Sequence, residues 1–103
     1  MKKKGKPMRN QKLTPIIAGR IVKHTKQSDG VLAIRFTDDS VMKIKTGAAF
    51  TDSIVGRTVK AIRQQATEFD LDFTDGTSAK ITLAEETSSV MLRDKAGALE
   101  YAD

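Results

Sequence analysis

The sequence predicts an all-β domain in which two tandem three-stranded β-meander repeats are followed by a C-terminal hairpin. Three features lead to this prediction: an internal repeat, period-two alternation of apolar residues within each copy, and a turn motif at the same place in both copies. Two copies are too few for a solenoid, so the strands are expected to form either a small barrel or a sandwich.

The repeat is an alignment of residues 19–45 with residues 56–82 at an offset of 37 residues. The alignment needs no gap, and ten of its 27 positions are identical. The offset divides the chain into repeat one, residues 19–55, and repeat two, residues 56–92, within a single β domain of residues 13–103.

Each repeat is expected to contribute three strands. The middle strand has the clearest pattern, because every second residue is large and apolar: Leu32, Ile34 and Phe36 in repeat one, and Phe69, Leu71 and Phe73 in repeat two. Such alternation places the apolar residues on one face of a half-buried sheet. The predicted strands are Arg20–Lys26, Val31–Phe36 and Val41–Thr46 in repeat one, and Arg57–Gln64, Glu68–Phe73 and Ser78–Leu83 in repeat two.

A tight turn separates the second and third strands of each copy, at Thr37–Ser40 and at Thr74–Thr77. An Asp-Gly pair between alternating runs is a strong hairpin signal, because glycine accepts a positive φ without steric cost. Asp39 stands at the position of Gly76, and aspartate also visits the left-handed region.

The segments outside the repeated strands are expected to behave differently from one another. Residues 1–12 are basic and nearly free of apolar residues, which predicts a disordered tail. The segment Gly47–Val55 is interpreted as the connection between the repeats, with room for one helical turn. Ser89–Arg93 and Ala98–Tyr101 are predicted to pair as the C-terminal hairpin, residues 89–101.

Charge is unevenly distributed along the chain. Residues 1–66 contain 15 Lys and Arg against four Asp and Glu, residues 67–103 contain three against nine, and the formal net charge is +5. Such asymmetry is typical of nucleic-acid contact, of self-association, or of a basic tail on an ordinary domain. The lack of cysteine favours a cytoplasmic location, and no apolar run approaches a membrane-spanning length, so no membrane partner is expected.

No motif indicates catalysis, a cofactor or a metal site. Asp70–Gly76 has the composition of a calcium loop, but its acidic spacing is wrong and strand alternation turns Asp70 and Asp72 away from the turn. His24 is the only histidine, so it has no second His or Cys to complete a transition-metal set. We therefore expect the chain not to be an enzyme and to need no cofactor.

The basic residues are the leading candidates for a functional surface. In the tail and in repeat one they could form a stripe that contacts phosphates, although no exposed aromatic residue is expected beside them for base stacking. The candidate phosphate contacts are Lys2, Lys3, Lys4, Lys6, Arg9, Lys12, Lys23, Arg35, Lys43 and Lys45.

Three functional hypotheses follow from these features. The favoured one is a small non-catalytic binding or assembly module that acts through protein–protein contacts, with self-association between a basic face and an acidic face as one form of it. The alternative is an accessory nucleic-acid-binding protein that places its tail and its first-repeat cations on phosphates. An enzyme or small-ligand binder with a pocket between the copies ranks third.

Overall fold

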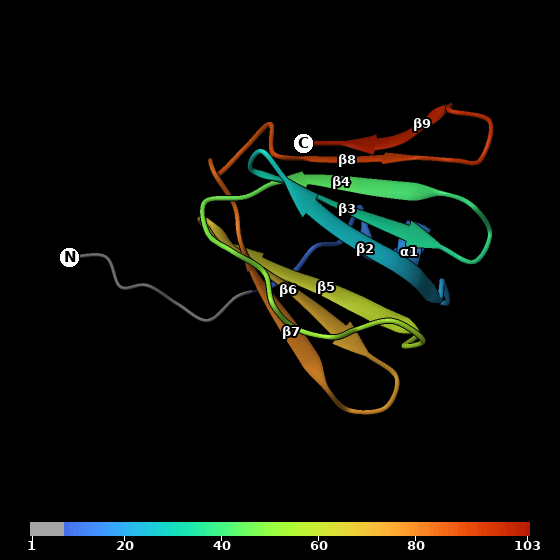
Figure 1. The fold of residues 1–103 in the computed structure, drawn as a ribbon. Coiled ribbons are helices and arrows are strands. Elements are labelled where there is room, and N and C mark those ends of the chain that lie inside the picture. Colours follow the sequence, from blue (N-terminus) through green and yellow to red (C-terminus); the bar gives the residue numbers. More distant parts are fainter. Residues whose placement is uncertain (1–7) are drawn as a thin grey trace.

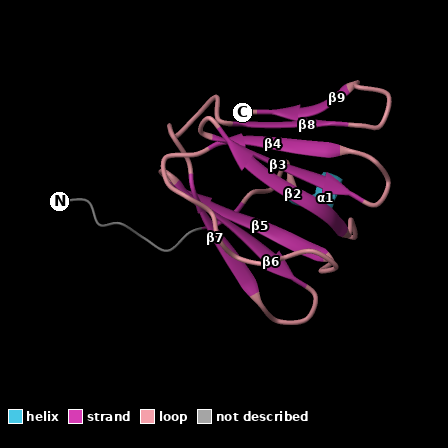
Figure 2. Cartoon of the chain, viewed as in Figure 1, coloured by secondary structure: helices cyan, strands magenta, loops and turns pink. Residues whose placement is uncertain are grey.

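All nine strands that the structure describes lie in two antiparallel sheets (Figures 1 and 2). The computed structural model describes residues 8–103. The four-stranded sheet has the order β1-β5-β6-β7, with β1 at Met8–Arg9, β5 at Val59–Gln65, β6 at Glu68–Phe73 and β7 at Ser78–Thr82. The five-stranded sheet has the order β2-β3-β4-β8-β9, with β2 at Val22–Ser28, β3 at Val31–Phe36, β4 at Val41–Lys45, β8 at Val90–Arg93 and β9 at Leu99–Ala102. The all-β prediction is confirmed.

The two sheets do not close into a barrel, so that alternative of the prediction is wrong. Within residues 8–103, β1 and β7 form the edges of one sheet and β2 and β9 the edges of the other. The sheets are joined by two isolated bridges, Ile21↔Thr58 and Thr46↔Leu83. Each bridge lies just outside the named strands, so the sheets meet at two corners and remain separate layers elsewhere (Figure 1).

One hydrophobic core is shared by both sheets and follows the alternation of the sequence. The inward side chains of β3 and β6 are at most 1% exposed: Leu32, Ile34, Phe36, Phe69, Leu71 and Phe73. Met42 and Ile44 of β4 and Ala79 and Ile81 of β7 belong to the same cluster. Burying each large apolar side chain stabilises the fold by roughly 1.5–3 kcal/mol, so this core is the main stabilising element.

The units β2–β4 and β5–β7 share one internal register. In each unit the first two strands shift register after the first pair, so that Val22↔Phe36 is followed by His24↔Arg35, and Val59↔Phe73 by Ala61↔Asp72. Backbone hydrogen bonds between the units are reciprocal at the offset of 37 residues. Gly19 N–H donates to the Val59 carbonyl and Gly56 N–H to that of Val22 (both 2.8 Å), while Gly47 N–H donates to Thr82 and Ala84 N–H to Lys45 (both 2.9 Å). The hydrogen bonds that join the two units are therefore reciprocal at the offset of the sequence alignment.

The turn between the second and third strands has the same conformation in both units. Asp39 has a φ of +68° and Gly76 one of +89°, so both occupy the left-handed region that the sequence predicts for them. The preceding aspartates accept hydrogen bonds of 2.9 Å from the backbone two residues on, Asp38 from Ser40 and Asp75 from Thr77. These bonds fix the turns locally, independently of the core.

The residues before the first repeat take part in the fold. The disorder expected for residues 1–12 does not extend to residues 8–12, because β1 pairs with β5 and Asn10 begins a turn; residues 1–7 lie outside the described part of the chain. The short helix α1, Thr14–Ile17, was not predicted. Its Thr14 Oγ accepts a hydrogen bond from Ile62 N–H (3.0 Å) and donates one to the Ile62 carbonyl (3.3 Å), which fixes α1 beside β5.

No helical turn forms in the Gly47–Val55 connection. Within residues 8–103, no helix is long and apolar enough to cross a membrane.

The C-terminal hairpin extends the first unit rather than the second. β8 pairs with β4, and β9 pairs with β8, so two strands are added to the sheet of repeat one (Figure 1). Two hydrogen bonds of 3.0 and 2.7 Å from the Arg20 guanidinium to Glu100 tie β9 to the start of β2. The Asn10 amide also donates to the Tyr101 hydroxyl (3.0 Å). As a result, the outer face of the first unit is widened by residues from the end of the chain.

Candidate binding surface

Five exposed cationic side chains lie together on the outer face of the five-stranded sheet. They are Lys26 of β2, Arg35 of β3, Lys43 and Lys45 of β4, and Arg93 of β8, and they are called the basic face below. Three of them, Arg35, Lys43 and Lys45, are among the residues that the sequence singles out as candidate contacts. The structure therefore gathers these three with two further cations on one surface.

The pairing register places these side chains on the same face. Lys26 is opposite Ala33, and Ala33 is opposite Lys43; in the next row Arg35 is opposite Val41, and Val41 is opposite Arg93. Directly opposed residues of antiparallel strands point to the same side of a sheet. The rows therefore alternate cationic and small or apolar side chains across the strands.

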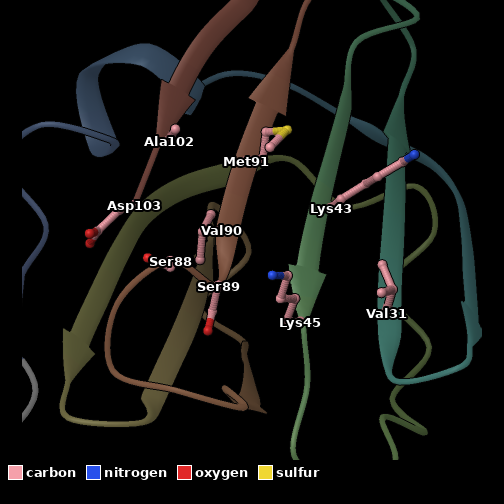
Figure 3. A pocket seen from close by; sticks show the side chains of 9 residues that line it. All are labelled: Val31, Lys43, Lys45, Ser88, Ser89, Val90, Met91, Ala102 and Asp103. Atoms are coloured by element: carbon pink, nitrogen blue, oxygen red, sulfur yellow. The ribbon is translucent and has the colours of Figure 1, made fainter.

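A groove of about 480 Å³ crosses this face (Figure 3). Lys43 and Lys45 line it from β4 and Met91 lines it from the neighbouring strand β8, with Asp103 at one end; the Lys43 side chain extends over β3, away from Met91 (Figure 3). Its remaining lining is Val31, Ser88, Ser89, Val90 and Ala102. A smaller depression beside it is bordered by Val41, Lys43, Met91 and Arg93. The groove thus combines an apolar floor with ammonium groups.

The five cations of the basic face have no ion-pair partner among the described residues, although Asp103 lies at one end of the groove. Among residues 8–103, no carboxylate lies within 4.0 Å of the charged nitrogens of its five cations. The Arg93 guanidinium donates a hydrogen bond to the Gly97 carbonyl (2.9 Å). The positive charge of this face is therefore left for solvent or for a ligand to neutralise.

On the outer face of the four-stranded sheet, which has the same register, two cations have carboxylate partners. Arg63 of β5 forms an ion pair with Asp72 at 2.7 Å and one with Asp70 at 3.5 Å, and Lys80 of β7 lies 3.7 Å from Glu68. The Arg63 hydrogen bonds lower the pKa of Asp72. The positions of Glu68, Asp70 and Asp72 correspond at the offset of 37 to Val31, Ala33 and Arg35. The basic face therefore has no acidic residues at the positions where β6 has Glu68, Asp70 and Asp72.

Asp70 is unusual because it lies on an outer face and is only 4% exposed. Its Oδ1 atom has no hydrogen-bond partner among the described residues. Burial and the neighbouring Glu68 carboxylate raise the pKa of Asp70 from 3.8 to about 6, against the opposing effect of Arg63. The sequence gives no sign of this burial, because alternation alone places Asp70 on the solvent side.

Replacing Asp70 with asparagine is expected to stabilise the protein at neutral pH. The folded state binds the Asp70 proton more tightly than the unfolded state does, so stability is lost as the pH rises from about 4 to about 6. Asparagine has no charge to bury. The free energy of unfolding of the Asp70→Asn variant should therefore exceed that of the wild type by about 1–2 kcal/mol near pH 7.5, and the two should differ little below about pH 4.

Urea unfolding of both proteins across this pH range measures the difference. A variant that is less stable than the wild type near neutral pH would show instead that the Arg63 guanidinium requires this carboxylate.

Of the other candidate cations, Arg9, Lys12 and Lys23 are described by the structure, and they are not part of the basic face. Lys2, Lys3, Lys4 and Lys6 lie outside the described residues. Arg9 is in β1, opposite Arg63 at the edge of the four-stranded sheet, and Lys12 is exposed in the turn before α1. Lys23 precedes His24 at the register shift of β2, and its ammonium group is 3.6 Å from Asp39.

Lys26 and Arg93 are the members of the basic face that sequence reasoning missed. β2 is polar on both sides after Val22, so its residues show no readable alternation. One signal is available for Lys26, because Arg63 at the matching position is also basic. Arg93 joins the face only because β8 adds to β4, and no local pattern in the sequence specifies that pairing.

No group of three or more His, Asp or Glu side chains within residues 8–103 could hold a metal ion. His24 lies opposite Arg35, beside the basic face.

The comparisons with known proteins give no further assignment: no family model, no curated protein and no solved structure matches this chain.

Proposed function

We propose that this chain is a non-catalytic binding module that holds an acidic protein partner against its basic face. The observation that carries the proposal is the contrast between two outer faces built on one register. On the face of β5–β7, Arg63 and Lys80 form ion pairs with carboxylates of β6, whereas the five cations of the basic face have no such partners within residues 8–103. An acidic partner supplies the missing carboxylates.

In this proposal the two units are diverged copies of one β-meander. The ten identities at an offset of 37 residues and the reciprocal hydrogen bonds between the units support a duplication. In this proposal the copies diverged after duplication, so that one has Asp70 and Asp72 in its middle strand and the other has Ala33 and Arg35 at these positions. This divergence converts a self-neutralised surface into one that attracts anions.

A protein partner is favoured over a nucleic acid because the face offers apolar contacts and no exposed Phe, Tyr or Trp ring among the described residues. Met91 is 38% exposed on this face, and Val31 and Val41 are half-buried. Phe36, Phe69 and Phe73 are buried, Phe50 packs against the core, and the Tyr101 hydroxyl is bonded to Asn10. Proteins that bind single strands normally stack bases on exposed rings, and proteins that bind duplexes need few apolar contacts.

A second copy of the chain is the weaker candidate for the partner. Self-association needs an acidic surface, and the carboxylates of the four-stranded face are already in ion pairs with Arg63 and Lys80. The chain also carries a net charge of +5, which opposes association at low salt. The absence of cysteine suits a module that works in the reducing cytoplasm.

Fluorescence anisotropy with labelled probes of equal net charge tests the class of partner. The probes are a peptide of three Glu-Glu-Val-Val repeats, single-stranded DNA, duplex DNA and single-stranded RNA. At about 150 mM salt the peptide is expected to bind the full chain at least about tenfold more tightly than any nucleic acid. Tighter binding of a nucleic acid would contradict the proposal and support the accessory nucleic-acid-binding role.

A further inference from the structure

We infer that the groove on the basic face selects acidic segments that also carry apolar side chains, and that Met91 is the residue that confers this selectivity. This inference rests on the proposed function and names the kind of segment that the face would bind. The surface differs from a simple polyanion site because apolar side chains, Val31 of β3 and Met91 of β8, lie on either side of the two lysines of β4.

The composition of the groove is the first support. Its volume of about 480 Å³ is large enough to receive aliphatic side chains from a partner. Its floor includes Val31 and Met91, with Lys43 and Lys45 beside them (Figure 3). A purely electrostatic contact surface gains nothing from an exposed methionine, whereas burial of its flexible thioether side chain against an apolar partner is favourable.

The spacing of the face is the second support. Lys43 and Lys45 are alternate residues of β4, so their Cα atoms are about 7 Å apart along the strand. An extended partner presents alternate side chains to the sheet at the same spacing. A segment that alternates acidic and apolar residues on its facing side can therefore set a carboxylate beside Lys45 while an apolar side chain covers Met91, which is opposite Lys43.

The two kinds of contact respond differently to salt. Attraction between exposed charges is screened as the ionic strength rises, but burial of apolar surface is not. A ligand that uses the groove should thus keep part of its affinity at high salt. A polyanion held only by the cations should lose nearly all of its affinity under the same conditions.

The test compares two labelled peptides of equal charge, three repeats of Glu-Glu-Val-Val and three of Glu-Glu-Ser-Ser, at about 50 and about 300 mM salt. The valine peptide is expected to bind about tenfold more tightly at the higher salt. Met91→Ser should weaken binding of the valine peptide about five- to tenfold and leave the binding of the serine peptide unchanged.

Met8→Ser provides the matched control, since Met8 is 75% exposed at the edge of the other sheet and should affect neither peptide. Equal binding of the two peptides, or equal effects of the two methionine variants, would overturn the inference while leaving the proposed function intact. If neither peptide binds, the proposed function fails as well. Circular dichroism of both variants establishes that the fold is retained.

Discussion

Replacing Phe36 or Phe73 with alanine is expected to lower the free energy of unfolding by about 3–5 kcal/mol. The two rings occupy equivalent positions at the ends of β3 and β6, and they are 0% and 1% exposed. Truncation leaves a cavity in the shared core, which the surrounding strands cannot fill without breaking their pairing. Domains of this size are stable by only about 5–15 kcal/mol, so either variant should be close to unfolding.

Urea unfolding followed by circular dichroism measures these losses. Phe50→Ala is the control, because the Phe50 ring is only partly buried at the margin of the core, and its loss should cost markedly less. Because the two rings are buried to the same extent in one core, similar losses are expected for Phe36 and Phe73. A loss below about 1 kcal/mol for either residue would place its ring outside a packed core and contradict the fold.

Reversing the charge of Lys43 and Lys45 together, to glutamate, is expected to weaken binding of the Glu-Glu-Val-Val peptide at least about thirtyfold at about 150 mM salt. Each substitution removes an attraction and adds a repulsion at the centre of the basic face. Both side chains are exposed and have no ion-pair partner within residues 8–103, so the free energy of unfolding should change by less than about 0.5 kcal/mol per site.

The internal repeat supplies a matched control for this variant. Lys60 and Lys80 are exposed on the other unit, and Lys80 aligns with Lys43 at the offset of 37. The double variant Lys60→Glu, Lys80→Glu therefore changes the net charge of the chain by the same amount at a different surface. It should alter peptide binding by less than about twofold, since charges beyond a Debye length are screened at this salt. Equal losses in both double variants would mean that net charge alone attracts the peptide.

Local pattern was sufficient to predict most of the strands. The alternation at Leu32, Ile34 and Phe36 identified a buried face because inward residues of a half-buried sheet must be apolar. The turn at Asp39 was predictable because few residues tolerate a positive φ. These signals depend only on neighbours in the chain, which is why the sequence alone reveals them.

Long-range pairing was not predictable in the same way. Nothing in Val90–Arg93 specifies that it adds to β4 rather than to β7, yet this choice brings Arg93 and Met91 to the basic face. The pairing of Met8 with Gln64 could not be predicted either, because a strand of two residues shows no alternation. The two sheets are joined at the Ile21↔Thr58 bridge, between residues far apart in the sequence. No single segment therefore shows whether the sheets close into a barrel.

The candidate surface was foreseen in part for the same reason. Arg35, Lys43 and Lys45 were identified because strand alternation sets them opposite the core residues. Lys26 was missed because β2 is an edge strand with polar residues on both faces. That these four cations have no ion-pair partners stands out only beside the ion pairs of the four-stranded sheet. This comparison needs the strand pairing of both sheets, which the sequence does not give.

The most direct test of the central claim is to map the bound peptide onto the chain by two-dimensional ¹H–¹⁵N NMR. The full chain, labelled with ¹⁵N, is titrated with the Glu-Glu-Val-Val peptide at about 150 mM salt. If the basic face is the binding surface, the largest amide shift changes will fall in β4 and β8, at residues 41–45 and 90–93, with those of β5–β7 nearly unchanged. The largest changes in β5–β7, or no change anywhere, would contradict it.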